Sequence, residues 1–132
     1  MAAAAIDTSV LVRYLTNDDP VKAASVGSLL ERTSDASLLV PDVVVAELAF
    51  VLLRVYRWPV SSVADAVRAV VNHRAIDAPG RALWLDVADD LERGGGPIDA
   101  YLLRVAEQGG IGTVLTFDRE MKALPNVRCE AP

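Results

Sequence analysis

Two aspartates of this 132-residue sequence each follow an expected strand directly, where they could act together on a cation or a phosphate. Asp7 comes after a short apolar run at the N-terminus, and Asp118 comes after the strand expected at Thr113 to Phe117. Because the carboxyl ends of parallel strands meet at one edge of a sheet, we expect both side chains at that edge. The alternative role of each aspartate is to cap the helix that follows it.

A third carboxylate, Glu47, interrupts a strongly apolar expected helix. Its neighbours one turn away are Val43, Val44, Phe50 and Val51. This spacing predicts a charge in the middle of an apolar face, where an unpaired carboxylate is costly. The alternative is an ion pair with Arg54, but that residue lies about two turns, or ~10 Å, further along the helix axis. The pattern therefore favours a metal-binding or catalytic role for Glu47.

The fourth carboxylate, Asp99, lies in the first turn of an expected helix, where it could simply complement the helix dipole. The same helix face continues with Leu102, Leu103 and Ala106. Asp99 is therefore expected to head the inward face. Four carboxylates without a histidine suit Mg²⁺ or Mn²⁺, which prefer oxygen ligands, and do not suit zinc. Such a centre could activate water, orient a phosphate and stabilise a leaving oxygen.

The segments around these acids resemble the four successive acidic motifs of PIN domains, and their order and spacing resemble the VapC-type toxins of bacterial toxin–antitoxin pairs. The four segments are Ile6 to Val10, Val45 to Leu48, Ile98 to Ala100 and Leu115 to Arg119. The resemblance implies an endoribonuclease whose Mg²⁺ or Mn²⁺ is held by Asp7, Glu47, Asp99 and Asp118. It also implies that Thr8 and Thr116 support the site. Two departures are an alanine-rich first strand and Met121, which stands where phenylalanine is common.

The expected elements indicate one α/β domain over residues 1–132. Strands are expected at residues 3–6, 37–40, 113–117 and 127–129, and helices at 8–15, 21–32, 42–57, 62–72, 79–93, 97–108 and 118–124. This alternation predicts a Rossmann-like central parallel sheet of four to five short strands flanked by helices. Asp19 and a capping box of Ser62 with Asp65 are the expected helix starts. Asp89, Asp90 and Glu92 are expected on a solvated helix face.

Composition limits the class of protein. The apolar content of 52 % is enough for an ordered core, and the single cysteine excludes a disulfide framework, which fits a reducing cytoplasm. The N-terminus lacks the features of a signal peptide, and no apolar run is long enough for a membrane span. The net charge of −5 argues against an RNA substrate. Metal binding at the acids and the predominance of arginine among the cations weaken that objection.

Partner binding is expected along the helices at 42–57 and 62–72, whose apolar content exceeds what one buried stripe needs. The surplus could be core, could form a homodimer contact, or could form a groove for an antitoxin segment. The residues expected to contact this partner are Val51, Leu52, Val55 and Trp58.

Three other functions compete with a toxin ribonuclease. The first is a PIN-type nuclease of RNA processing, and the second is a binding module that keeps the fold without the chemistry. The third is a phosphohydrolase that forms an aspartyl-phosphate, which expects a second aspartate two residues after the first. Ser9 occupies that position, so the third class is disfavoured.

Overall fold

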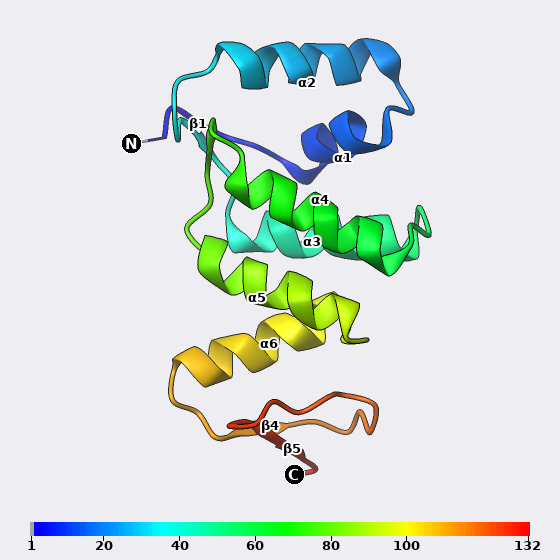
Figure 1. The fold of residues 1–132 in the computed structure, drawn as a ribbon, viewed down its shortest axis with the longest axis vertical. Helices are drawn as coiled ribbons and strands as arrows, with labels where there is room; N and C mark the ends of the chain where they lie inside the picture. The colour runs from blue at the N-terminus through cyan, green and yellow to red at the C-terminus, as the bar shows by residue number, and fades with distance from the viewer. Residues whose placement is uncertain (1) are drawn as a thin grey trace.

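The computed structural model describes residues 2–132, which form six helices and five short strands (Figure 1). In chain order these are β1 (Ala4–Ala5), α1 (Thr8–Thr16), α2 (Pro20–Arg32), β2 (Leu38–Leu39), α3 (Asp42–Arg54), α4 (Val60–Asn72), β3 (Ile76–Asp77), α5 (Arg81–Glu92), α6 (Pro97–Gln108), β4 (Thr113–Leu115) and β5 (Arg128–Glu130). Within the described residues, none of these helices is long and apolar enough to cross a bilayer.

The strands are all parallel, as the sequence predicts, and the α/β class is confirmed. They form two sheets rather than one continuous sheet: β1-β2-β3 and β4-β5. Ala4 lies opposite Leu38 and Leu38 opposite Ile76, while Val114 lies opposite Cys129. The two sheets are separated along the long axis by α3 to α6, and α2 lies beyond the first sheet (Figure 1).

Two expectations about local structure were wrong. Strand β3 was missed, because two residues are too few to show an alternating pattern; it forms by pairing with β2, where the Val40 N–H donates to the Asp77 carbonyl at 2.9 Å. The helix expected at 118–124 does not form. Instead, the Asp118 carboxylate accepts a hydrogen bond from the Glu120 N–H at 2.9 Å, which closes a turn.

One expected helix start is confirmed and one is wrong. Asp19 caps α2 by accepting a hydrogen bond from the Lys22 N–H at 3.1 Å, and Pro20 follows at the first helical position. The capping box of Ser62 with Asp65 is absent, since α4 already begins at Val60 and has no side-chain cap. Pro59 has a fixed φ and directly precedes the first helical residue, so α4 begins at Val60, two residues before the start that the polar residues indicated.

The main core forms where α3, α4 and α5 pack together beneath β1-β2-β3. Its fully buried side chains include Val45, Leu48, Leu52, Val63, Val67, Val71, Trp84 and Val87. A second, smaller core joins α6 to the β4-β5 sheet, and it consists of Leu103, Ala106, Val114 and Val127. The C-terminal sheet is therefore held by its own small apolar cluster.

The Asp42 carboxylate connects three helices. It begins α3 and accepts two hydrogen bonds at 3.0 Å each, from Trp84 Nε1 on α5 and from the Tyr101 hydroxyl on α6. The two aromatic rings stack on one another with their centroids 4.9 Å apart. Any Cβ at Gly80 would overlap the Asp42 carboxylate, so the glycine leaves room for it. Burial raises the pKa of Tyr101, and its hydrogen bond to Asp42 adds to the effect.

We expect Asp42→Ala to lower the free energy of unfolding by about 2–4 kcal/mol, because it leaves two partly buried donors without their charged acceptor. Urea denaturation measures this change. The matched control is Asp86→Ala at an exposed position of α5, which should stay within roughly 0.5 kcal/mol of the wild type. Equal stability of the two variants would contradict the connecting role of Asp42.

Candidate active site

Asp7 leaves β1 at the carboxyl end, as the sequence predicts. The buried Ile6 donates its N–H to the Leu39 carbonyl at 2.9 Å, so the chain is held to β2 up to the residue before Asp7. Asp7 is the N-cap residue of α1, but its side chain does not cap the helix. Its carboxylate accepts a hydrogen bond from Ser9 Oγ at 2.7 Å, which holds the pKa of Asp7 below its usual value. Asp7 is exposed and ionised, while the neighbouring Thr8 is buried.

Glu47 is exposed, and this contradicts the expectation of a charge in a buried apolar face. Helix α3 turns one face into the core through Val44, Val45, Leu48, Ala49 and Leu52. Glu47 lies on the other face, where Val43 is 73 % and Phe50 46 % exposed. The error arises because α3 is apolar nearly all round, so residue type alone does not distinguish its buried face from its exposed one. The cost of a buried charge is therefore no argument for a role of Glu47.

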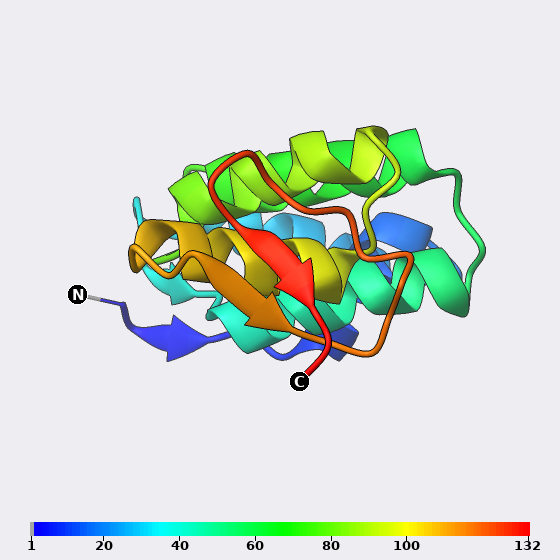
Figure 2. The same ribbon diagram turned by 90° about the horizontal axis from the view of Figure 1, so that it is seen from below.

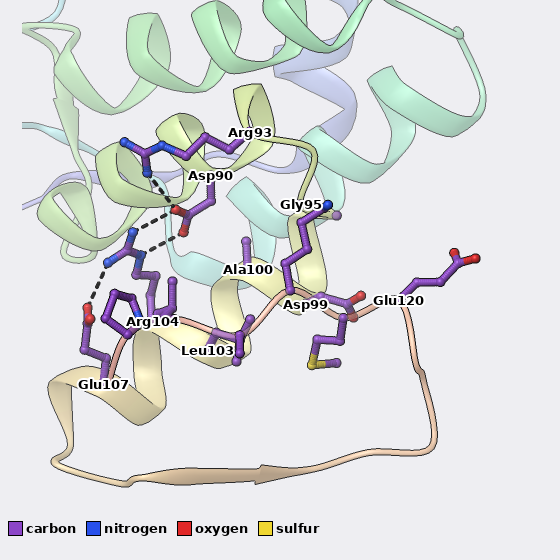
Figure 3. Close-up of a pocket in the computed structure, with 15 residues that line it drawn as sticks. Asp90, Arg93, Gly95, Asp99, Ala100, Leu103, Arg104, Glu107 and Glu120 are labelled. Atoms are coloured by element: carbon purple, nitrogen blue, oxygen red, sulfur yellow. Dashed lines mark hydrogen bonds and ion pairs between the residues drawn. The ribbon is translucent and has the colours of Figure 1, made fainter. Parts of the chain in front are cut away.

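Asp99 is half-buried in the first turn of α6, on the side that continues through the buried Leu103 and Ala106. Of the three neighbours that the sequence assigned to the inward face, Leu102 is 45 % exposed. Asp99 lines a cavity of about 520 Å³ between α5, α6 and residues 120–125. In Figure 3 it lies toward the Glu120 side of this cavity, away from the ion pair of Asp90 and Arg104.

Asp118 follows β4 in an exposed turn. Its backbone N–H donates to Thr116 Oγ1 at 2.9 Å, and its carboxylate accepts from the Glu120 N–H. Thr116 thus holds the backbone of the turn that carries Asp118. The intervening Phe117 is 82 % exposed, which is unusual for a large aromatic side chain.

The four carboxylates do not converge within one chain. Asp7 follows a strand of the first sheet and Asp118 a strand of the second, and α3 to α6 lie between these sheets (Figure 1). Across residues 2–132, no group of three or more His, Cys, Asp or Glu side chains is placed to hold a metal ion. The oxygen donors suit Mg²⁺ chemically, but a single chain in this arrangement does not present them together.

An ion pair that the sequence did not predict forms one wall of the cavity. Asp90 is 8 % exposed and receives two hydrogen bonds from Arg104, each at 2.7 Å (Figure 3). The hydrogen bond to Asp90 raises the pKa of Arg104 further. Asp90 was expected on a solvated face together with Asp89 and Glu92. Its helical spacing from the buried Leu83 and Val87 is the signal that could have placed it inward.

The predicted partner surface is only partly accessible. Val55 is 66 % exposed, and Val51 and Trp58 are half-buried against the main core. Leu52 is fully buried, which contradicts a direct contact between this side chain and a partner. Much of the apolar surplus of α3 and α4 is therefore core, because the two helices pack on each other, α4 also packs on α5, and α3 also packs on α1 and α6.

Comparison with known families gives one result. The family model of the PIN domain matches residues 4–127, which is nearly the whole chain. No curated protein shows a significant match to the sequence. The family match includes all four carboxylates that the sequence singled out.

We expect Arg104→Ala to destabilise the protein by about 3 kcal/mol, because it leaves the buried Asp90 carboxylate with only the longer contact to the exposed Arg93, at 3.4 Å. The matched comparison is Arg68→Ala, since Arg68 also contacts several carboxylates, namely Asp65, Asp89 and Glu92, but these are largely exposed. Its loss should cost no more than about 1 kcal/mol. Chemical denaturation measures the free energy of unfolding of both variants. An equal loss of stability in the two would show that the burial of Asp90 does not strengthen its pairing with Arg104.

Proposed function

The chain belongs to the PIN domain family, and from this premise we propose that it is a metal-dependent endoribonuclease that hydrolyses RNA phosphodiester bonds. The observation that carries the proposal is the match over residues 4–127, which supports a nuclease-type function. PIN domains are generally metal-dependent nucleases, and Mg²⁺ or Mn²⁺ is the proposed cofactor. Asp7, Glu47, Asp99 and Asp118 are the proposed ligands, with Thr8 and Thr116 in support.

The chemistry of the side chains supports this assignment. Carboxylate oxygens are the ligands that hard divalent cations prefer, and three of the four proposed ligands are exposed to solvent where an ion and an RNA phosphate could reach them. The hydrogen bond from Ser9 lowers the pKa of Asp7, which favours the deprotonated form that binds a cation. The net charge of −5 means that substrate binding depends on neutralisation of these carboxylates by the cation.

The proposed biological role is that of a toxin, inhibited by a cognate antitoxin protein. This role is supported by the order and spacing of the four acidic segments, which resemble those of VapC-type toxins. The proposed antitoxin contact comprises Val55, Val51 and Trp58 at the end of α3 and the loop after it. An apolar antitoxin segment would bury the exposed side chain of Val55, which is 66 % exposed in the free chain.

One observation favours a second function, a PIN-fold binding module without catalysis. Within residues 2–132 of one chain, the acids are too dispersed to hold a metal ion together. An inactive module would be expected to bind a partner protein or RNA without cleaving it. An assay for RNA cleavage therefore separates the two functions.

We expect Asp118→Asn to abolish Mg²⁺-dependent cleavage of single-stranded RNA while the protein stays folded. The substitution removes a charged ligand with almost no change in volume. Its effect on the rate should exceed the roughly 10–100-fold that loss of a residue behind a metal ligand costs. Cleavage of a labelled RNA is the measurement, with circular dichroism as the check on folding and Asp86→Asn as the matched control. A folded Asp118→Asn variant with full activity would remove Asp118 from the site.

We expect Mg²⁺ or Mn²⁺ to raise the melting temperature of the wild type, because a ligand that binds only the folded state stabilises it. At a concentration of about 100 times the dissociation constant this amounts to about 2.7 kcal/mol. The shift should be largely lost in Glu47→Gln and retained in Glu31→Gln, which changes an exposed glutamate of α2. Equal thermal shifts in both variants would place the metal away from Glu47.

A further inference from the structure

A second cavity, of about 450 Å³, lies on the C-terminal sheet. Its walls come from the loop after β4, from β5 and from the residue that follows β5. Seen from below, the two strands run side by side in the same direction, and the loop leaves β4 at its carboxyl end (Figure 2). Most of the residues that line the cavity are exposed, so a ligand can reach it from solvent.

Phe117 lines this cavity, and at 82 % it is the most exposed large apolar side chain in the part of the chain that the structure describes. It is not a member of the small core that holds the C-terminal sheet. Hydrogen bonds fix the backbone on either side of it, from the Asp118 N–H to Thr116 Oγ1 and from the Glu120 N–H to Asp118 Oδ1, both at 2.9 Å. Because this turn is already ordered, little conformational entropy is lost when a flat ligand covers the ring.

Two arginines share the cavity with Phe117. Arg128 pairs with Glu130 at 3.5 Å, but both side chains are exposed, and such pairs are weak. Arg119 is exposed, and none of the ion pairs within residues 2–132 involves it. The guanidinium group suits phosphate, which it can bind through two hydrogen bonds. Asp118 and Glu130 balance the two arginines in charge, so a divalent cation on Asp118 would make the cavity positive.

We propose that this cavity binds one unpaired nucleotide of an RNA strand, with the base stacked on Phe117 and the phosphate held by Arg119 and Arg128. An aromatic ring beside cationic side chains suits single-stranded nucleic acid, since every base has a flat face and every nucleotide a phosphate. A base within a duplex is already stacked on its neighbours and does not offer that face. The proposal rests on the proposed nuclease function for the identity of the nucleic acid, and it adds the form in which the substrate binds.

The cavity adjoins two of the proposed metal ligands. Asp118 lines it directly, and Met121 and Ala123 line both this cavity and the larger one that contains Asp99. A nucleotide stacked on Phe117 therefore brings the neighbouring phosphodiester bond close to Asp118, and the strand can continue towards the second cavity. An apolar peptide segment would also cover the phenylalanine, but it would leave the arginines of the cavity without an anionic partner.

Binding is tested first with AMP and Mg²⁺, because AMP carries a base and a phosphate but no phosphodiester bond that a nuclease could cut. Phe117→Trp places a fluorescent ring at the stacking position, and we expect AMP to quench its emission. The matched control is Leu115→Trp, since Leu115 is 63 % exposed on the same strand but lies outside the cavity. The wild type gives the background from Trp58 and Trp84. Equal quenching in the two variants, or none in Phe117→Trp, would overturn the proposal.

The affinity for RNA is measured next, by fluorescence anisotropy of a labelled single-stranded oligonucleotide. Every variant also carries Asp7→Asn, which lies outside the cavity and should prevent cleavage during the measurement. Phe117→Ala should weaken binding by roughly 5- to 150-fold, the range that stacking of one base on an aromatic side chain accounts for. Phe117→Tyr keeps an aromatic face and should keep the affinity, as should Leu115→Ala. Circular dichroism checks that each variant is folded.

The role of the arginine is tested by comparing AMP with adenosine, which lacks the phosphate. In the Phe117→Trp background, Arg119→Gln should weaken the binding of AMP and leave the binding of adenosine unchanged. The matched control is Arg32→Gln, which changes an exposed arginine at the end of α2. Equal affinity for AMP in the two arginine variants would remove Arg119 from the site.

The outcomes separate this site from the proposed function and from a contact between proteins. If the wild type cleaves RNA but Phe117→Ala binds it with full affinity, the nucleotide site is wrong and the nuclease function stands. If AMP and RNA bind at Phe117 but no RNA is cleaved, the nuclease function fails and the site stands. Equal affinity for single-stranded RNA and for a duplex of the same sequence would overturn the assignment of an unpaired nucleotide. Unchanged affinity of Phe117→Ala with a lower sedimentation coefficient would assign the ring to a contact between copies instead.

Discussion

The contact of Asp42 with Trp84 and Tyr101 is the interaction on which the helical part of the molecule depends. One carboxylate at the start of α3 accepts hydrogen bonds from α5 and α6, and the two donors also stack on each other. Helices α3 and α5 contribute many of the buried side chains of the main core, and α3 and α6 carry Glu47 and Asp99. The orientation of the proposed ligands on α3 and α6 is thus set by a carboxylate that is not itself one of them.

The C-terminal sheet is held more weakly than the rest of the chain. Its small core has four buried side chains, and a two-stranded sheet is marginal by itself. Glycines flank α6 on both sides, at residues 94–96 and at 109–110, and Gly94 and Gly110 have positive φ. The buried pair of Asp90 and Arg104 fixes α6 to α5, but the described contacts leave the outer edge of β4 open.

The position of the acids connects this architecture with function. A nuclease of the PIN family is expected to gather its carboxylates at the carboxyl ends of parallel strands. The sequence predicts that Asp7 and Asp118 meet at one edge of a sheet. In the structure the strands that precede them belong to separate sheets, so this prediction and the arrangement of one chain disagree.

The sequence by itself determined the α/β class, the extents of most helices to within a few residues, the cap at Asp19 and the position of the acids after their strands. These features arise from neighbours in the chain, through periodicity and local hydrogen bonds. Only the tertiary structure decided that Glu47 is exposed, that Leu52 and Asp90 are buried, and that the strands form two sheets. A helix as apolar as α3 has no unique inward face in its sequence, and a strand of two residues has no pattern. The buried face of α3 and the pairing of the short strands are decided by the elements that pack against them, and these contacts join residues far apart in the chain.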